Sequence, residues 1–418
     1  MSRELPAGPL DGYRVLELGS TVAGPFCGRL FADFGAEVIK VEPVEGDPVR
    51  SMGRRCEGKS LYAASLFRNK SLISIDLRTD EGRDIVRRLA DKCDFLIENF
   101  RPGTLESWGL GYDALSATNP GLIMVRISGY GQSGPYSSWP GYGVICEAVS
   151  GLRHLTGDAD RPPGRVATSM TDYITGLYAA FGALLALEAR HSTGKGQIVD
   201  AALYESAFSF MEPHVPAYQK LGVVAMRAGS RLPGNTPNNL YPTADGQYVH
   251  ITAASDAVFR RLAQAIGKPE MITDERFATA IARIENEDAA DEAIGAWTAQ
   301  RDCAEVEKVL RAAKVPASHI YTIADIFNDP HYAARGMLAN VPDNELGDIT
   351  LANVVPRLLQ TPGEIRRSGG RVGQDTARVL RELAGMNELE IDALKKRNIV
   401  SCDPHTAPAR DVEASEAS

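Results

Sequence analysis

Short apolar runs alternate with amphipathic segments along the amino-terminal third of the chain. Apolar runs of strand length occupy residues 14–19, 37–42, 71–77, 94–98 and 122–128, and helical spacing occurs over 26–34 and 79–92. Strands that alternate with helices are typical of a parallel sheet covered by helices. The turn at Gly19 lacks the G-x-G-x-x-G pattern, so the sequence does not indicate NAD binding. We therefore predict an α/β fold with a large Rossmann-like domain.

The pattern changes after a stretch rich in Gly, Pro and Asn at residues 227–242, which marks a linker or an active-site loop. A strand at 248–252 and amphipathic helices at 257–266, 289–299 and 304–313 then predict a smaller α+β domain. The predicted division is a first part of the large domain at 1–225, a small α+β domain at 226–325, a return segment at 326–400 that completes the large domain, and a disordered tail at 401–418.

Asp172 stands at the beginning of a long apolar helical pattern that continues through residues 174–187. A carboxylate in a first helical turn faces unpaired backbone N–H groups and the positive end of the helix dipole, which favours its ionised form. An ionised carboxylate can attack a thioester. Aspartate is also a common helix cap, so the local sequence supports a capping role as well as a nucleophilic one.

Composition excludes several classes of function. The 418 residues carry a net charge of −9 with dispersed Lys and Arg, which indicates no nucleic-acid or anionic-membrane partner. The six cysteines have no C-x-x-C spacing, which predicts reduced thiols and no metal site. The first residues lack an apolar signal segment, and the most apolar helical segment is interrupted by Gly176 and Gly182. We expect a cytoplasmic protein.

Several motifs together resemble the class III CoA-transferases, the superfamily of formyl-CoA transferase and carnitine CoA-transferase. The matching runs are LDGYRVLEL at 10–18, AGP at 23–25, ADFGAEVIKVEP at 32–43, GDP at 46–48, RNK at 68–70, ENFRPG at 98–103, GLGY at 109–112, NP at 119–120, SGYG at 128–131, TGKGQ at 193–197, VP at 315–316 and DP at 329–330. They span residues 10–400 in the order of the family.

The resemblance implies an interlocked homodimer of two ring-shaped chains, and it places the catalytic aspartate at Asp172. In the family's reaction the carboxylate attacks an acyl-CoA to give an aspartyl anhydride and CoA thiolate, and the thiolate then forms an aspartyl-CoA thioester. An incoming carboxylic acid reverses these steps and leaves as a new acyl-CoA. The implied partners are acyl-CoA and carboxylic acid substrates, with no permanently bound cofactor.

The resemblance also implies which residues hold CoA. Arg101 and Lys70 are the basic groups in matching motifs, the backbone around Val22 and Ala23 lies where the family grips the cofactor, and Asn99, Phe100 and Tyr142 complete the predicted set. By itself, Arg101 also fits a solvated loop arginine.

Gly234 and Asn235 are the candidate residues for a glycine-containing loop that closes over the aspartate in the family. Their backbone N–H groups would stabilise the oxyanion of the tetrahedral intermediates. A Pro-Gly pair is a strong turn signal in its own right, so an ordinary linker turn is the alternative interpretation.

Two other functions stay open beside transfer. An α-methylacyl-CoA racemase needs a histidine near Tyr142, and none of His154, His191 or His214 fits, which favours transfer. A non-catalytic CoA-binding protein would tolerate Asp172→Ala.

The choice of acid is less constrained by the sequence. Val22 and Gly143 differ from the residues of the oxalate-linked enzymes, which argues against oxalate or formate. We predict transfer from succinyl-CoA to an organic acid, with dicarboxylic acids among the candidates. Four arginines can pair with a second carboxylate or remain surface charges: Arg54, Arg55, Arg165 and Arg231.

Overall fold

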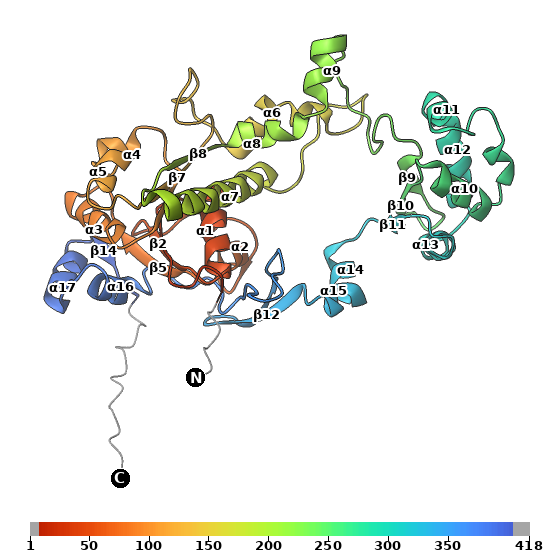
Figure 1. The fold of residues 1–418 in the computed structure, drawn as a ribbon. Helices are drawn as coiled ribbons and strands as arrows, with labels where there is room; N and C mark the ends of the chain where they lie inside the picture. Colours follow the sequence, from red (N-terminus) through yellow and green to blue (C-terminus); the bar gives the residue numbers. More distant parts are fainter. Residues whose placement is uncertain (1–7, 404–418) are drawn as a thin grey trace. The chain divides into compact units, whose positions relative to one another are not determined.

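The computed structural model describes residues 8–403, which form two compact units (Figure 1). The large unit comprises the described parts of Met1–Ser150, Val166–Glu212 and Ala334–Ser418, and the small unit comprises Gly151–Arg165 and Pro213–Ala333. The small unit therefore begins earlier and ends later than the predicted 226–325. Of the predicted tail, Ser401 belongs to the strand Val400–Ser401, whereas residues 404–418 lie outside the described part of the chain.

A seven-stranded sheet organises the large unit, with the order β14-β5-β2-β1-β6-β7-β8. The strands are β1 (Arg14–Glu17), β2 (Glu37–Glu42), β5 (Ser71–Ile75), β6 (Phe95–Glu98), β7 (Ile123–Ser128), β8 (Ile198–Ala202) and β14 (Val400–Ser401). All neighbours are parallel except β14, which runs antiparallel to β5. Without β14, the strands have the doubly wound order 3-2-1-4-5-6, whose direction reverses between β1 and β6. The predicted α/β fold with a mainly parallel sheet is confirmed.

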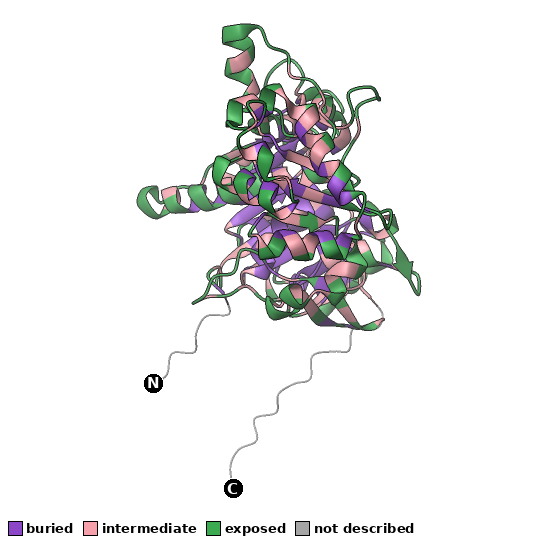
Figure 2. Ribbon diagram, turned by 90° about the vertical axis from the view of Figure 1, so that its right-hand side faces the viewer, coloured by how far each residue is buried: buried purple, intermediate pink, exposed green. Residues whose placement is uncertain are grey.

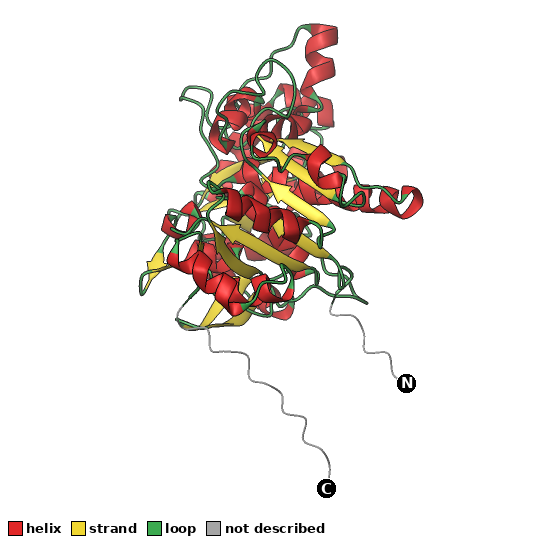
Figure 3. Ribbon diagram, turned by 90° about the vertical axis from the view of Figure 1, so that its left-hand side faces the viewer, coloured by secondary structure: helices red, strands yellow, loops and turns green. Residues whose placement is uncertain are grey.

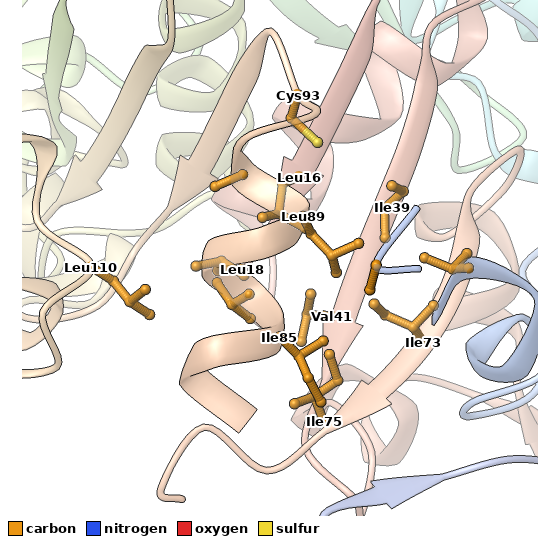
Figure 4. Close-up of a cluster of buried hydrophobic side chains, with 14 of the residues drawn as sticks. Leu16, Leu18, Ile39, Val41, Ile73, Ile75, Ile85, Leu89, Cys93 and Leu110 are labelled. Carbon is orange, nitrogen blue, oxygen red and sulfur yellow. The ribbon is translucent and has the colours of Figure 1, made fainter. Parts of the chain in front are cut away.

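The sheet separates two hydrophobic cores because successive residues of a strand point to opposite faces. On one face, Leu16 of β1 packs with Ile85 and Leu89 of α3 (Asp80–Ala90), as Figure 4 shows. On the other face, Val15 packs with residues of α1 (Ala23–Asp33) and α7 (Met170–Thr193). Helices therefore cover both faces (Figure 3), and the strands are buried along most of their length (Figure 2).

Helix α7 packs closely against the beginning of α1. A Cβ atom on Gly176 would lie 2.8 Å from the carbonyl oxygen of Ala23, so a larger residue would push the helices apart. Ala179, Ala183 and Ala186 continue this buried stripe. Helix α7 is also the one helix of residues 8–403 whose length and apolar character would suffice for a membrane span. Its packing on the sheet identifies it as a core helix of the large unit.

Shorter elements complete the large unit. They are β3 (Arg55–Cys56), β4 (Lys59–Ser60), α2 (Leu61–Leu66), α4 (Thr104–Ser107), α5 (Tyr112–Ser116), α6 (Gly143–Val149), α8 (Leu203–Phe208), β12 (Leu338–Asp343), β13 (Gly347–Ala352), α16 (Thr376–Glu382) and α17 (Glu388–Lys396). The helical stretch around Pro213 is divided, because this proline has no N–H to donate. Helix α8 ends before this proline, and α9 (His214–Leu221) begins after it in the small unit.

The small unit combines an antiparallel sheet with helices around a core that includes Trp297. Its strands are β9 (Asn238–Pro242), β10 (Tyr248–Thr252) and β11 (Ala317–His319). Its helices beyond α9 are α10 (Asp256–Ala265), α11 (Ala280–Glu285), α12 (Glu287–Thr298), α13 (Cys303–Ala312), α14 (Ile323–Asn328) and α15 (Pro330–Ala334).

Candidate active site

A cavity of about 230 Å³ opens in the large unit at the carboxyl ends of the parallel strands. Its lining comes from the segments after β1, β6 and β7, from the loop before α6, and from the first turn of α7. The cavity includes the place between β1 and β6 where the strand order reverses, which is where open α/β sheets bind ligands. Of the ten site residues predicted from the sequence, seven line this cavity: Val22, Ala23, Asn99, Phe100, Arg101, Tyr142 and Asp172.

Asp172 is the third residue of α7, which begins at Met170. Its carboxylate forms no ion pair and no hydrogen bond with another residue in the described part of the chain, so it faces the cavity without a cationic partner. Burial raises the pKa of Asp172 from its ordinary 3.8 to about 6, against a smaller lowering by the backbone N–H of Asp172 itself. The group is therefore mainly ionised at pH 7 and more basic than a free aspartate, as a nucleophile requires.

Gly143, the first residue of α6, leaves the space that the carboxylate occupies. A Cβ atom at this position would lie 2.2 Å from Oδ2 of Asp172, so only glycine admits this arrangement of the side chain. One turn further along α6, the buried thiol of Cys146 contacts the carbonyl oxygen of Gly129 at 3.3 Å. Burial and the charge of Asp172 raise the pKa of Cys146 to about 11, so this thiol stays protonated. Of these two groups, only the carboxylate of Asp172 is in its anionic form at neutral pH.

The amino terminus of α1 forms the wall of the cavity at Val22 and Ala23. Val22 occupies the N-cap position without a side-chain cap, and the first turn contains no acidic residue. Backbone N–H groups at an uncapped helix start attract anions, aided by the helix dipole. This wall can therefore hold a phosphate or an oxyanion.

Asn99 fixes the backbone that leads into this wall. Its Oδ1 accepts a hydrogen bond from the Ser20 N–H at 2.7 Å, and its Nδ2 donates to the Ser20 carbonyl at 2.9 Å. Both polar atoms of the amide are therefore engaged by protein. Asn99 shapes the site through Ser20.

Phe100, Arg101 and Tyr142 line the cavity in different ways. Phe100 is half-buried with its ring against Trp108, 5.3 Å between centroids. The Arg101 side chain is exposed and has no hydrogen-bond or ion-pair partner among residues 8–403, so its charge is available to a ligand. Tyr142 is 74% exposed at the N-cap position of α6.

The predicted role of Lys70 in CoA binding needs a correction. Its side chain is fully buried, and its Nζ atom lies 2.7 Å from Oε2 of Glu17 and 2.6 Å from the carbonyl oxygen of Pro25. Burial lowers the pKa of Lys70 to about 8, against the opposing effect of Glu17. An ammonium group enclosed in this way cannot reach a ligand in the cavity. Lys70 supports the site from within the protein.

Gly234 and Asn235 belong to the small unit, so their proposed closure over Asp172 remains a prediction. Gly234 has a φ of +79°, and the Asn235 N–H bonds to the carbonyl of Leu232 at 3.1 Å, which is the geometry of a turn. Arg231 is not free for a substrate carboxylate, because its guanidinium lies within 3.5 Å of Glu287, Asp288 and Asp291. Arg54 and Arg165 are exposed, and Arg55 donates to the carbonyl of Arg50.

A second cavity of about 250 Å³ shares Ser20 and Phe100 with the first. It lies at the ends of β1, β2 and β5, has a mainly apolar lining that includes Trp108, and has Arg78 among its lining residues. Its residues come from four separate segments of the chain, so no local sequence pattern predicts it. No histidine is among the residues that line either cavity, and residues 8–403 contain no cluster of His, Cys, Asp or Glu that could hold a metal ion.

The fold and the site define an α/β protein with an unpaired carboxylate in a cavity at the switch point of its sheet. Residues 10–376 match the model of the CoA-transferase family III, and the chain belongs to this family of CoA-transferases. It is 48% identical over 402 residues to the succinyl-CoA–D-citramalate CoA-transferase of Chloroflexus aurantiacus, covering 96% of this chain and all of that one. It is 41% identical to the beta subunit of succinyl-CoA–L-malate CoA-transferase from the same organism, over 94% of this chain and 98% of that one.

Solved structures agree with the assignment. The crystal structure of a CAIB/BAIF family protein from Brucella suis matches with a TM-score of 0.81 and 35% identity, covering 90% of this chain and 99% of that one. As in other CoA-transferases, CoA thioesters are the substrates.

Proposed function

We propose that this enzyme transfers CoA from succinyl-CoA to a short dicarboxylic acid of the citramalate or malate type. The observation that carries the proposal is the ionised, unpaired carboxylate of Asp172 in a cavity at the switch point of the sheet. The names of two relatives, at 48% and 41% identity, supply the donor and the class of acceptor. Both acceptors carry two carboxylates.

The reaction proceeds through two kinds of covalent intermediate, aspartyl anhydrides and an aspartyl-CoA thioester. An oxygen of Asp172 attacks the thioester carbonyl of succinyl-CoA, the C–S bond breaks, and a mixed anhydride and CoA thiolate form. The thiolate attacks the aspartyl carbonyl of the anhydride, which releases succinate and leaves an aspartyl-CoA thioester. The acceptor carboxylate attacks this thioester to give a second anhydride, and the thiolate then attacks the acceptor's acyl carbon. The new acyl-CoA leaves, and Asp172 is again a carboxylate.

The cavity suits this series of reaction steps because none of the steps requires a proton acceptor. Every nucleophile is already an anion, so a histidine is unnecessary, and the lining contains none. A racemase needs a proton acceptor and donor on either side of the substrate α-carbon. The lining offers only one basic carboxylate, which favours transfer.

CoA binds in our proposal along the wall formed by Val22 and Ala23. The N–H groups at the start of α1 and the free guanidinium of Arg101 provide local positive potential in an acidic protein. The second cavity extends the site beyond Phe100, which gives an extended ligand such as CoA a longer track. Backbone N–H groups at Gly234 and Asn235 would stabilise the oxyanions when the loop closes.

The exposed face of α7 supports the proposed homodimer. Leu177, Phe181 and Leu185 project from this helix with 55–57% of their surface exposed, and their spacing places them on one side. A contiguous apolar stripe on a long helix is costly in water and is typical of a protein interface. We propose that a second copy of the chain covers it, in the interlocked arrangement, in the cytoplasm.

The test is mass spectrometry of acyl-CoA products after incubation with succinyl-CoA and a panel of mono- and dicarboxylic acids in D2O. We expect a new acyl-CoA with a dicarboxylic acid, its loss in Asp172→Ala, and its retention in Asp113→Ala, a matched change at an exposed first-turn aspartate of α5. A product with monocarboxylic acids alone would refute the acceptor class. Deuterium at the α-carbon without new acyl-CoA would refute transfer.

A further inference from the structure

One wall of the catalytic cavity is held in place by buried charged side chains. Ser20, Thr21, Val22 and Ala23 line the cavity, and they follow β1 without a sheet partner of their own. Two buried lysines contact the backbone at the two ends of this stretch. One contacts the carbonyl oxygen at its beginning, and the other contacts the carbonyl oxygen just beyond its end, inside the first turn of α1.

Lys40 holds the beginning of the stretch. Its ammonium, 1% exposed, donates to the carbonyl oxygen of Gly19 and lies 2.9 Å from Oδ2 of Asp47. The other oxygen of Asp47 accepts hydrogen bonds from the N–H of Thr21 at 3.1 Å and of Val49 at 2.9 Å. One ion pair therefore fixes the backbone on both sides of Ser20.

Thr21 shows why this fixing matters. Its φ is +67°, a left-handed conformation that is sterically unfavourable for a β-branched residue. A free loop would relax out of this conformation. The hydrogen bond to Asp47 opposes that relaxation, and the next residue, Val22, is the N-cap residue of α1 at the cavity wall.

Lys70 and Glu17 hold the far end of the stretch in the same way. Lys70 donates to the carbonyl oxygen of Pro25 and pairs with Glu17, and Glu17 lies 3.8 Å from Lys40, so one carboxylate links both lysines. The interior is adapted to this carboxylate, because a Cβ atom on Gly28 would lie 1.8 Å from its Oε2.

We propose that Lys40 and Asp47 are positioning residues of the enzyme, which hold Gly19–Val22 so that the N–H groups at the start of α1 point to the bound CoA thioester. Well-packed apolar residues stabilise a fold as effectively as a buried ion pair, so fold stability alone gives little reason for charges here. Fixed backbone geometry next to a ligand is a use that apolar residues cannot supply. The inference rests on the proposed function, because it assumes that CoA binds at this wall.

The test compares two isosteric changes that each neutralise one buried carboxylate of the large unit. Asp47→Asn breaks the pair with Lys40 beside the cavity. Asp33→Asn breaks the buried pair with Arg68, 2.6 Å long, at the other end of α1, and Asp33 is not among the residues that line the cavity. Both variants lose thermal stability. We expect the KM for succinyl-CoA to rise about tenfold in Asp47→Asn only, with kcat within about threefold of the wild type in both.

A rescue experiment separates positioning from general damage. Glycine adopts positive φ without a steric penalty. Thr21→Gly added to Asp47→Asn should therefore lower the raised KM at least threefold. The same change added to Asp33→Asn should recover nothing. Equal KM values for Asp47→Asn and the wild type, equal KM changes in both single variants, or no rescue would overturn the proposal.

If Asp47→Asn does not fold, hydrogen exchange of the wild-type protein tests the positioning proposal instead. We expect the Thr21 amide to exchange as slowly as the amides of β2, because it bonds to a buried carboxylate. Exchange at the rate of an exposed loop amide would overturn the proposal. This measurement needs no substrate, so it stands even if the wild-type enzyme fails to turn over succinyl-CoA, which would refute the proposed function instead.

Discussion

Replacing Asp172 with asparagine should stabilise the protein at neutral pH while abolishing transfer. Burial raises the pKa of this carboxyl from 3.8 to about 6, so the folded state holds the neutral form more tightly than the unfolded state does. At 1.36 kcal/mol for each unit by which the pKa is raised, the ionised form destabilises the folded protein by about 3 kcal/mol. Because the side chain is only partly buried, solvent screening reduces this figure to about 1–2 kcal/mol. Asparagine removes that cost.

The sign of the effect gives it a defined pH window. Below pH 3.8 the carboxyl is neutral in both states and adds no penalty, and the penalty grows up to about pH 6 and is then complete. The gain in Asp172→Asn should therefore be largest at pH 8 and should shrink as the pH falls towards 4. Differential scanning calorimetry of both proteins at pH 4.5, 6 and 8 measures it.

An exposed aspartate in the first turn of another helix provides the control. Asp113→Asn in α5 removes a favourable charge–dipole interaction, so it should lower stability at pH 8 by about 0.3–1 kcal/mol. Opposite signs for the two variants would show that the cavity destabilises the ionised Asp172. A lower Tm for Asp172→Asn at pH 8, or a gain that does not depend on pH, would refute the reasoning.

Three further outcomes follow from the site. The acid limb of kcat/KM should fall tenfold for each pH unit below about 6, because only ionised Asp172 attacks; a limb centred near 4 in a pH–rate profile would contradict this. Arg101→Gln should raise the KM for succinyl-CoA about tenfold without lowering Tm, whereas Arg88→Gln, at an exposed arginine of α3, should leave steady-state kinetics unchanged. Gly143→Ala should lower kcat about 10–100-fold in a folded enzyme, because its Cβ displaces the carboxylate; full activity would show that Asp172 accommodates it.

Local sequence patterns predict the fold of the large unit. Apolar runs of strand length and amphipathic helices determine the parallel sheet, and five predicted strands between residues 14 and 128 occur within a few residues of their predicted limits. The start of α7 close to Asp172 is also a local signal, whereas the catalytic role predicted for Asp172 came from the family resemblance and remains a prediction. The hairpin β12–β13 and the helices α16 and α17 were missed, since their packing depends on partners far away in the chain.

The role of Lys70 shows where local reasoning fails. A lysine next to Asn69 in a loop motif fits the pattern of a surface cation. Only the fold shows that Glu17, 53 positions earlier, lies beside it. Gly143 is a similar case, because a glycine after a turn carries no sign that a carboxylate fills the place of its side chain. Both contacts join segments that meet only after the sheet has formed.

The surroundings of Lys70 and Gly143 have a common physical cause. In the proposed mechanism the carboxylate of Asp172 must be ionised without a cation beside it, since an ion pair would lower its basicity and occupy its oxygens. The protein therefore keeps the lysines enclosed beneath the cavity wall, where Lys40 and Lys70 pair with Asp47 and Glu17, while Asp172 faces the cavity without a partner. Sequence motifs record that charged residues are required around the site. Which charges face the ligand, and which hold the backbone behind it, is decided by burial.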